Sequence, residues 1–340
     1  METKILKSSS DDITAAAKIL RSGGLVAIPT ETVYGLAANA LDESAVARIF
    51  KAKGRPQDNP LIVHVSKIAD ALPLVEDFPE TARSLAEKFW PGPLTLVLKK
   101  SHIVPDIVSA GLDTVAVRVP SHPVALAVIA AAGIPLAAPS ANISGSPSPT
   151  AARHVLSDLD GKIDAIIDGG NCRVGVESTV LSLCGQPRLL RPGWVSVAEI
   201  QAVIGKVDVD RGVLRELSPG QPAASPGMKH KHYAPRAKAV LVEADSRGFA
   251  EYVTAQVAAS GQNCAALCFD EDVPLLSIPV VSLGKSGDYS AQARRLFAAL
   301  RQLDDSGAQM IFAHAPEKDG VGLAVYNRLL RACGFNLIDN

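Results

Sequence analysis

Short apolar runs recur along the chain, and most of them are followed at once by Gly, Pro or small polar residues. Runs typical of buried strands lie at 25–28, 61–65, 94–98, 114–119, 134–138, 164–167, 177–182 and 188–191. Segments with apolar residues at helical spacing lie between many of them, at 11–20, 43–50, 81–90, 122–132 and 195–204. Aromatic residues make up only 4% of the chain, so the core must consist of Ala, Val, Leu and Ile. This pattern predicts an α/β fold.

The length and a change in composition indicate two domains. The 340 residues exceed the roughly 100–200 residues of one domain. Pro and Gly are frequent from Ser218 to Pro235, so we expect a domain of residues 1–215, a linker of 216–237 and a second domain of 238–340. In the second domain, strand-like runs at 239–242, 265–268 and 310–313 alternate with helical segments at 249–258, 291–303 and 323–333. This alternation predicts a small parallel α/β sheet.

The linker carries an unusual group of residues from Lys229 to Tyr233, which reads KHKHY. A plain spacer has scattered charges and Gly, Ser or Pro. The cations and the Tyr could instead fold over a site as a lid that faces an anionic ligand. Both interpretations remain open from the composition.

Polar residues follow several strands of the first domain. The segment PTETVYG follows the run at 25–28, PSANISG follows the run at 134–138, and GVEST opens the run at 177–182. In open α/β sheets, ligands bind outside strand ends, so Thr30, Glu31, Thr32 and Tyr34 are candidate site residues. The alternative is an ordinary turn in which Thr and Glu cap the next helix.

Cations are concentrated where the helical segment at 43–50 ends. Lys51, Lys53 and Arg55 alternate there, and Gly54 and Pro56 end the helix. Three cations on one turn suit a polyphosphate, although basic residues at a helix end also complement its dipole.

Arg118 lies inside the apolar run at 114–119. A buried Arg needs an opposite charge, because leaving it unpaired costs several kcal/mol. The partner is either an internal carboxylate or the anion of a ligand, and the spacing does not choose between them.

Several classes of protein are disfavoured. The net charge is -1, so no global field attracts nucleic acid. The five cysteines are scattered and mostly within apolar runs, which predicts small buried side chains rather than a metal site. The N-terminus lacks an apolar signal core and no apolar run reaches the ~18 residues of a membrane span, so we expect a cytoplasmic protein.

The polar strand ends predict a cleft for a large anionic ligand, and a nucleoside triphosphate fits this description best.

At these residues the sequence resembles a known family. The segments PTETVYGL at 29–36, KxKGRP at 51–56, NPL at 59–61, PSAN at 139–142 and SPGMKHKHYAP at 225–235 are similar to the long form of the YrdC-like L-threonylcarbamoyladenylate synthases. The resemblance implies a twisted α/β catalytic domain with a basic concave cleft, a linker that acts as a lid, and a smaller Rossmann-like domain. It implies a nucleotidyltransferase that makes threonylcarbamoyl-AMP and pyrophosphate from L-threonine, bicarbonate or CO2, and ATP. A separate transferase would use the product to modify the adenosine beside the anticodon of tRNAs.

The resemblance also implies roles for particular residues. The catalytic cations would be Lys51, Lys53 and Arg55. The ATP contacts would be Arg55, Asn59, Ser140, Asn142, Arg191 and Tyr233. The L-threonine contacts would be Thr32, His64, Arg118 and Ser178, with Thr179 an alternative to Ser178. No metal ligands are expected from the protein, and Mg2+ would arrive with the ATP phosphates.

Two other functions remain as alternatives. The same basic cleft could bind double-stranded RNA through its phosphates, with a strong dependence on salt. The second alternative is the transfer of a carbamoyl group from carbamoyl phosphate. Related domains occur in enzymes of that kind, but this chain lacks their extra cysteine-rich segments.

Overall fold

The computed structural model describes residues 2–216 and 232–339, and these form two compact units. The first unit consists of residues 2–144 and 148–213, and the second of residues 145–147, 214–216 and 232–339. The predicted linker of residues 216–237 lies mostly outside the described residues, since 217–231 are not described. The lid role that we predict for Lys229 to Lys231 therefore also falls outside them.

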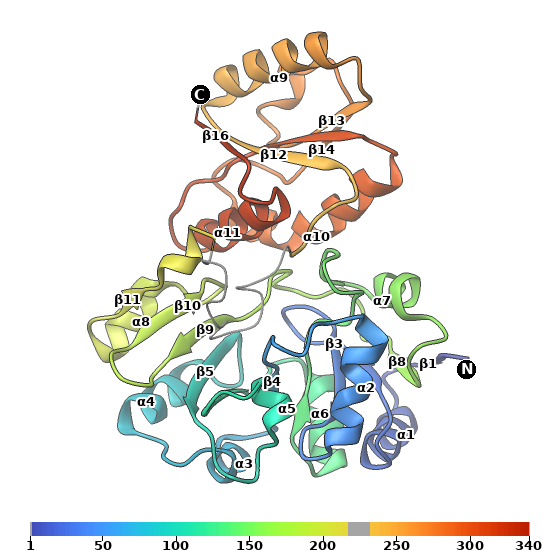
Figure 1. Cartoon of the computed structure of the whole chain (residues 1–340), viewed down its shortest axis with the longest axis vertical. Coiled ribbons are helices and arrows are strands. Elements are labelled where there is room, and N and C mark those ends of the chain that lie inside the picture. The colour runs from blue at the N-terminus through green and yellow to red at the C-terminus, as the bar shows by residue number, and fades with distance from the viewer. Residues whose placement is uncertain (1, 217–231, 340) are drawn as a thin grey trace. The chain divides into compact units, whose positions relative to one another are not determined.

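The first unit contains one large twisted sheet of mixed direction (Figure 1). Its strand order is β1-β8-β2-β3-β7-β4-β6-β5-β9-β10-β11. The strands are β1 (Lys4–Leu6), β2 (Val26–Ile28), β3 (Gly35–Asn39), β4 (Ile62–His64), β5 (Leu94–Lys99), β6 (Thr114–Arg118), β7 (Leu136–Ala137), β8 (Ala165–Ile167), β9 (Thr179–Ser182), β10 (Arg188–Arg191) and β11 (Asp208–Val209).

Helices connect these strands. They are α1 (Ser10–Arg21), α2 (Glu43–Lys53), α3 (Ile68–Ala71), α4 (Glu80–Phe89), α5 (Asp106–Ser109), α6 (Pro123–Ala132), α7 (Ala152–Leu159) and α8 (Val197–Ile204), with short 3-10 helices at Leu72–Leu74 and Arg211–Val213. The ends of α2 are set by local chemistry. The Asp42 carboxylate accepts the N–H groups of Ser44 and Ala45, and Gly54 ends the helix with a φ of 59°, which glycine adopts without strain.

The two faces of this sheet are buried differently. One face packs against α2, α4, α5, α7 and α8 in the largest core cluster. The other face is covered by α1 and α6 only over β2, β3, β7 and β8. Farther along that second face, a small separate cluster consists of strand residues alone: Ile62, Val97, Ala116, Val180 and Leu190. Side chains on β4, β5, β6 and β9 that share this face are thus placed beside strands rather than under a helix.

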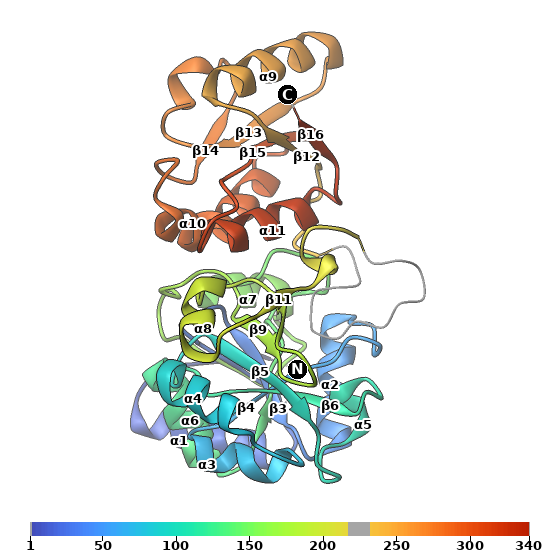
Figure 2. The same cartoon turned by 90° about the vertical axis from the view of Figure 1, so that its left-hand side faces the viewer.

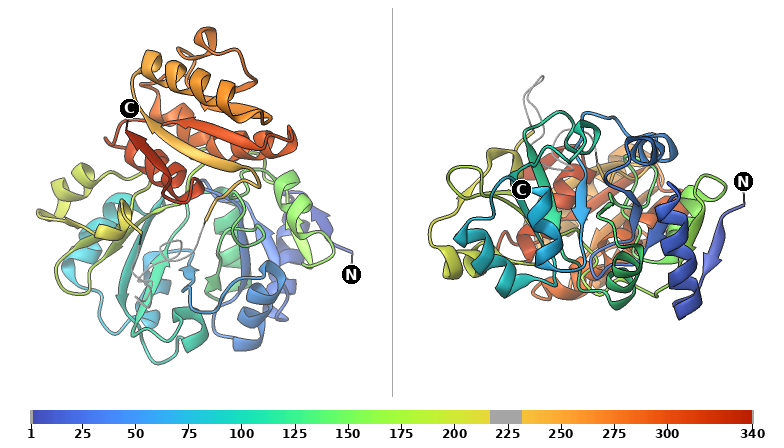
Figure 3. Two further views of the ribbon diagram at one scale, coloured as in Figure 1. Left: turned by 45° about the horizontal axis from the view of Figure 1, so that its top comes forward. Right: turned by 90° about the horizontal axis from the view of Figure 1, so that it is seen from below.

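The second unit is a five-stranded parallel sheet with helices on both faces (Figures 2 and 3). Its strand order is β14-β13-β15-β12-β16. Its elements are β12 (Lys238–Glu243), α9 (Ser246–Ser260), β13 (Cys264–Cys268), a 3-10 helix (Val273–Leu275), β14 (Val280–Ser282), α10 (Tyr289–Asp305), β15 (Met310–His314), α11 (Gly322–Ala332) and β16 (Leu337–Asp339). Helix α9 covers one face of the sheet, and α10 and α11 cover the other.

A buried hydrogen bond between two side chains joins strand ends of the second unit. The Nδ1 of His314 lies 2.7 Å from Oδ2 of Asp272, and its Nε2 lies 2.9 Å from the carbonyl oxygen of Ala244. Burial alone would raise the pKa of Asp272, but the hydrogen bond from His314 and other donors lowers it. The His314 ring stacks on Phe249 with a centroid distance of 4.5 Å, so the pair is enclosed by apolar rings.

The α/β class and the parallel second sheet are confirmed, whereas several details differ from the sequence prediction. Strands β1, β3, β11, β14 and β16 were not expected, because their runs are short or contain Gly or Ser. Four cysteines are buried as predicted, but Cys184 is exposed because it follows the end of β9. Among the described residues, no helix is both long and apolar enough to span a membrane.

Candidate active site

The alternation of side chains along the strands brings His64 and Arg118 to the same face. Strands β4 and β6 are parallel, with His64 opposite Arg118 in register. Ile62 and Ala116, two residues earlier on each strand, belong to the small strand-only cluster. Because side chains repeat every two residues along a strand, His64 and Arg118 point to that same side. Both are at least 97% buried, with exposed fractions of 3% each.

Three different groups fix the guanidinium of Arg118. Its Nε donates to the carbonyl oxygen of Gly92 at 3.1 Å, and its Nη1 donates to Oγ1 of Thr32 at 3.0 Å. Its Nη2 lies 2.6 Å from Oε1 of Glu31. The partner that the sequence left open is thus an internal carboxylate, and a hydroxyl predicted for the threonine site lies on the same guanidinium.

Backbone hydrogen bonds join the loops that carry the predicted residues. The N–H of Gly175 donates to the carbonyl oxygen of Thr32 at 3.2 Å, which joins the loop before β3 to the loop before β9. The N–H of Ala141 donates to the carbonyl oxygen of Tyr34 at 2.8 Å, and Gly35 forms a bridge with Ser140. The segments 30–35, 139–142 and 174–178 are therefore one connected set of strand ends.

Ser178 and Arg191 form a second buried group. The Oγ atoms of Ser178 and Thr95 lie 2.7 Å apart, and Arg191 donates through Nε and Nη2 to the carbonyl oxygen of Ser178 at 3.1 and 3.0 Å. Arg191 Nη2 also reaches Oγ of Ser178 at 3.2 Å. Thr179, the alternative to Ser178, instead donates its hydroxyl to the carbonyl oxygen of Val195. Ser178 is therefore the better of the two candidates.

Lys53 is buried and holds the loop after β7. Its Nζ donates to the backbone carbonyls of Ser140 and Asn142, and it lies 3.4 Å from Oδ1 of Asn142. The side chains of Ser140 and Asn142 are joined by a hydrogen bond of 2.6 Å. Burial lowers the pKa of Lys53, and the nearby Arg55 lowers it further. In this structure the cation thus contacts protein oxygens, and its role as a catalytic cation stays a prediction.

The other predicted cations differ from one another. Arg55 is buried and its Nη2 donates to the carbonyl oxygens of Asn59 and Pro60 at 3.3 and 3.1 Å, which shapes the turn before β4. Asn59 is buried in the same turn. Lys51 is exposed in the last turn of α2, so it does not join the buried group.

Two tyrosines that were site candidates belong to the packing of the units. The hydroxyl of Tyr34 donates to the carbonyl oxygen of Gly170 at 2.7 Å, and burial raises the pKa of this phenol. Tyr233, predicted as an ATP contact, is 1% exposed in the second unit, where its ring lies 5.1 Å from that of Phe297. The ATP contact expected of Tyr233 stays a prediction.

The burial of His64 makes the stability of the first unit depend on pH. Burial, and next the charge of Arg118, lower the pKa of His64 from 6.5 to about 3. The unfolded chain takes up this proton near pH 6.5 and the folded chain does not, so stability is full above that pH and declines as the pH falls towards 3. A single proton of this kind lowers the free energy of unfolding by up to about 1.4 kcal/mol for each unit by which the pH falls.

We therefore expect the His64→Gln variant to lose less stability than the wild type between pH 6.5 and 4. Urea unfolding at several pH values measures this difference. The exposed His102 supplies the matched control, because His102→Gln should leave the pH dependence unchanged. Parallel curves for the wild type and the His64 variant would contradict the prediction.

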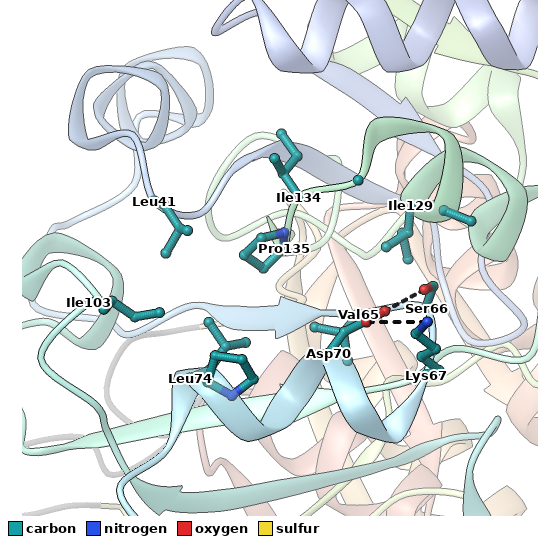
Figure 4. A pocket seen from close by; sticks show the side chains of 13 residues that line it. Leu41, Val65, Ser66, Lys67, Asp70, Leu74, Ile103, Ile129, Ile134 and Pro135 are labelled. Atoms are coloured by element: carbon teal, nitrogen blue, oxygen red, sulfur yellow. Dashed lines mark hydrogen bonds and ion pairs between the residues drawn. The ribbon is translucent and has the colours of Figure 1, made fainter.

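The candidate residues suit an anion rather than a metal ion. They carry hydroxyl, amide, guanidinium and ammonium groups, with the imidazole of His64 and the carboxylate of Glu31 among them. No group of three or more metal-ligating side chains occurs within residues 2–216 and 232–339. A hollow of about 430 Å³ lies past the end of β4 (Figure 4). Its lining is mainly apolar, with Ser66 and Lys67 contacting Asp70 at one side. It contains none of the predicted site residues, and its few polar groups do not suit a triphosphate.

Some contributors to the site were not predicted from the sequence. Thr95 is the polar residue within the apolar run at 94–98, and that irregularity is a signal that could have indicated it. Gly193 is needed because a side chain there would collide with the backbone of Ser178 and Thr179. Glu31 appeared among the candidates, but its pairing with Arg118 was not predicted.

Comparison with known proteins identifies relatives along the whole chain. The Sua5/YciO/YrdC family model, described as telomere recombination, matches residues 18–193. The model described as threonylcarbamoyl-AMP synthase, C-terminal domain, matches residues 195–334.

Individual proteins agree with both models. The threonylcarbamoyl-AMP synthase of Pyrococcus abyssi is 48% identical over 96% of this chain and 95% of its own length. That of Bacillus subtilis is 44% identical over 99% of this chain and 97% of its own length. The crystal structure of P. abyssi Sua5 complexed with L-threonine is 46% identical, covers all of both chains and has a TM-score of 0.92. The chain therefore belongs to the Sua5/YciO/YrdC family, in the two-domain form whose second part is the C-terminal domain of threonylcarbamoyl-AMP synthases, and it is an enzyme of that class.

Proposed function

We propose that the enzyme makes L-threonylcarbamoyl-AMP and pyrophosphate from L-threonine, bicarbonate or CO2, and ATP. The observation that carries this proposal is the position of Arg118. Thr32 and Glu31 hold its guanidinium on the sheet face that carries the small strand-only cluster. His64 lies close to it, and Ser178 belongs to the same unit. A fixed guanidinium is a natural receptor for the carboxylate of an amino acid. The relatives named threonylcarbamoyl-AMP synthase, and the threonine complex of P. abyssi Sua5, support threonine as that amino acid.

The ATP would bind along the turn and loop that carry Arg55, Asn59, Ser140 and Asn142, with Arg191 as a further contact. Backbone and side-chain hydrogen bonds hold these residues in place, and Arg55 adds a cation. Mg2+ would neutralise phosphate charge when it enters with the nucleotide. The protein side of this site is thus a set of donors for phosphate and ribose oxygens.

The proposed chemistry has two stages. The amine nitrogen of threonine forms a bond to the carbon of CO2, and two protons leave for the solvent as the ammonium becomes a carbamate. A carbamate oxygen then attacks the α-phosphorus, and the bond to the β-phosphate breaks with its electron pair leaving on pyrophosphate. Arg55 would lower the barrier by compensating the charge that gathers around the phosphorus.

The product would serve a separate transferase that modifies the adenosine next to the anticodon in tRNAs. We also propose that this takes place in the cytoplasm, which agrees with five free cysteines.

The test is pyrophosphate release by the purified full chain with ATP and Mg2+, with and without L-threonine and bicarbonate. We expect release only when both are present. Release that does not need threonine would contradict the proposal. Absence of release together with salt-dependent binding of duplex RNA would favour the RNA-binding alternative.

A further inference from the structure

Glu31 and Arg118 form a buried pair of opposite charges at the proposed threonine site. Their side chains are only 1% and 4% exposed, and Oε1 of Glu31 lies 2.6 Å from Nη2 of Arg118. The other oxygen, Oε2, accepts the backbone N–H of Ser121 at 3.1 Å. The carboxylate is therefore fixed from two directions, just as the guanidinium is fixed from three.

Neither charge is saturated by these contacts. A guanidinium has five N–H groups, and the hydrogen bonds to Gly92 and Thr32 use two of them. Nη2 faces Oε1 of Glu31 in the ion pair but has no hydrogen-bond partner among the described residues. A carboxylate has about four acceptor positions, and only the hydrogen bond from Ser121 uses one among the described residues, because Oε1 contacts Arg118 as an ion pair without a hydrogen bond. The pair therefore presents donors and acceptors side by side, which matches a ligand that carries both charges.

We propose that Glu31 determines specificity for an α-ammonium group in the ligand whose α-carboxylate binds Arg118. This inference rests on the proposed function, which puts threonine at that guanidinium. In an α-amino acid the ammonium stands on the carbon next to the carboxylate. A carboxylate bound to Arg118 therefore brings its ammonium close to Glu31, where the low dielectric of a buried site strengthens the attraction.

The same geometry disfavours ligands that have a carboxylate but no ammonium. Such a ligand would place a second anion beside Glu31 on one shared guanidinium. Like charges at short range in a buried site oppose binding. Glu31 thus excludes hydroxy acids of the same size and shape, which Arg118 alone would accept.

The experiment is titration calorimetry on the full chain with two ligands. One is L-threonine, and the other is 2,3-dihydroxybutanoate of matching configuration, which has a hydroxyl in place of the ammonium. We expect the wild type to prefer threonine by about tenfold or more, since a charged hydrogen bond is worth that factor. In the Glu31→Gln variant, the affinity for threonine should fall by a similar factor, whereas the affinity for the analogue should not fall. The preference for threonine over the analogue should therefore shrink.

The outcomes separate the specificity role from a purely structural one. If Glu31 serves only as the counter-ion of Arg118, the variant weakens both ligands by the same factor, and the inference is wrong. Equal affinity of the wild type for both ligands would also overturn the inference. This outcome is measured on the wild type alone, so it does not depend on whether the variant folds. A wild type that binds no threonine would overturn the proposed function itself. The exposed Glu87 provides the matched control, because Glu87→Gln should leave both affinities unchanged.

Discussion

Replacing Arg118 by lysine should lower threonine-dependent pyrophosphate release by about 100-fold or more. Lysine keeps the positive charge beside Glu31 but has no planar fork. It cannot reach Gly92, Thr32 and Glu31 at once, as the guanidinium does, and still bind a carboxylate. The loss of two charge-assisted hydrogen bonds, at roughly 1.5–3 kcal/mol each, gives an effect of this size. Steady-state kinetics with varied threonine would measure it.

We expect the Arg118 variant to be affected mainly in the response to threonine, with the apparent affinity for ATP changed little. The control is Arg83→Lys. The side chain of Arg83 is exposed on α4, and its ion pair is with Glu80 at 3.8 Å. If Arg118→Lys retained the threonine dependence of the wild type, this guanidinium would not be the carboxylate receptor.

Replacing Lys53 by methionine should remove nearly all activity and also destabilise the first unit. Methionine fills much of the same space but donates no hydrogen bond. The carbonyl oxygens of Ser140 and Asn142 would lose a buried donor, at a cost of about 1–3 kcal/mol for each group. Because Lys53 fixes the loop that holds two proposed ATP contacts, we expect activity to fall by at least about 100-fold.

Thermal unfolding and pyrophosphate release measured on the same preparation separate the two effects. Lys88→Met on the exposed side of α4 serves as the control and should change neither. A Lys53 variant that unfolds at a lower temperature but keeps full activity at 25 °C would show that Lys53 stabilises the fold without positioning the ATP loop.

Most of the elements could be predicted because their signals are local. The apolar runs at 61–65 and 114–119 contain β4 and β6, and Gly54 marks the end of α2. Strand β3 was missed, since Gly35 and the small residues that follow it also suit a turn. Its identity as a strand depends on pairing with β2 and β7, which lie on either side of it.

The candidate site was predicted in part. Thr32, His64, Arg118, Ser178, Ser140 and Asn142 come from strand ends that the structure joins or places on one face. The contacts that Lys53 makes with backbone carbonyls, and that Tyr233 makes with Phe297, were not predicted, and their roles towards a ligand stay predictions. Long side chains such as these can turn towards either a ligand or the protein, and the sequence carries no signal that decides between them.

The α/β class, the positions of most strands and the residues at their polar ends could all be derived from the order of residues. These follow from periodicity and from Gly and Pro, whose effects extend over a few residues. The pairing of Glu31 with Arg118 and the contact of Lys53 with the loop at Ser140 became visible only in the folded chain. A buried charge must find a partner, but which partner it finds depends on the register of the sheet and the closure of loops distant in the sequence.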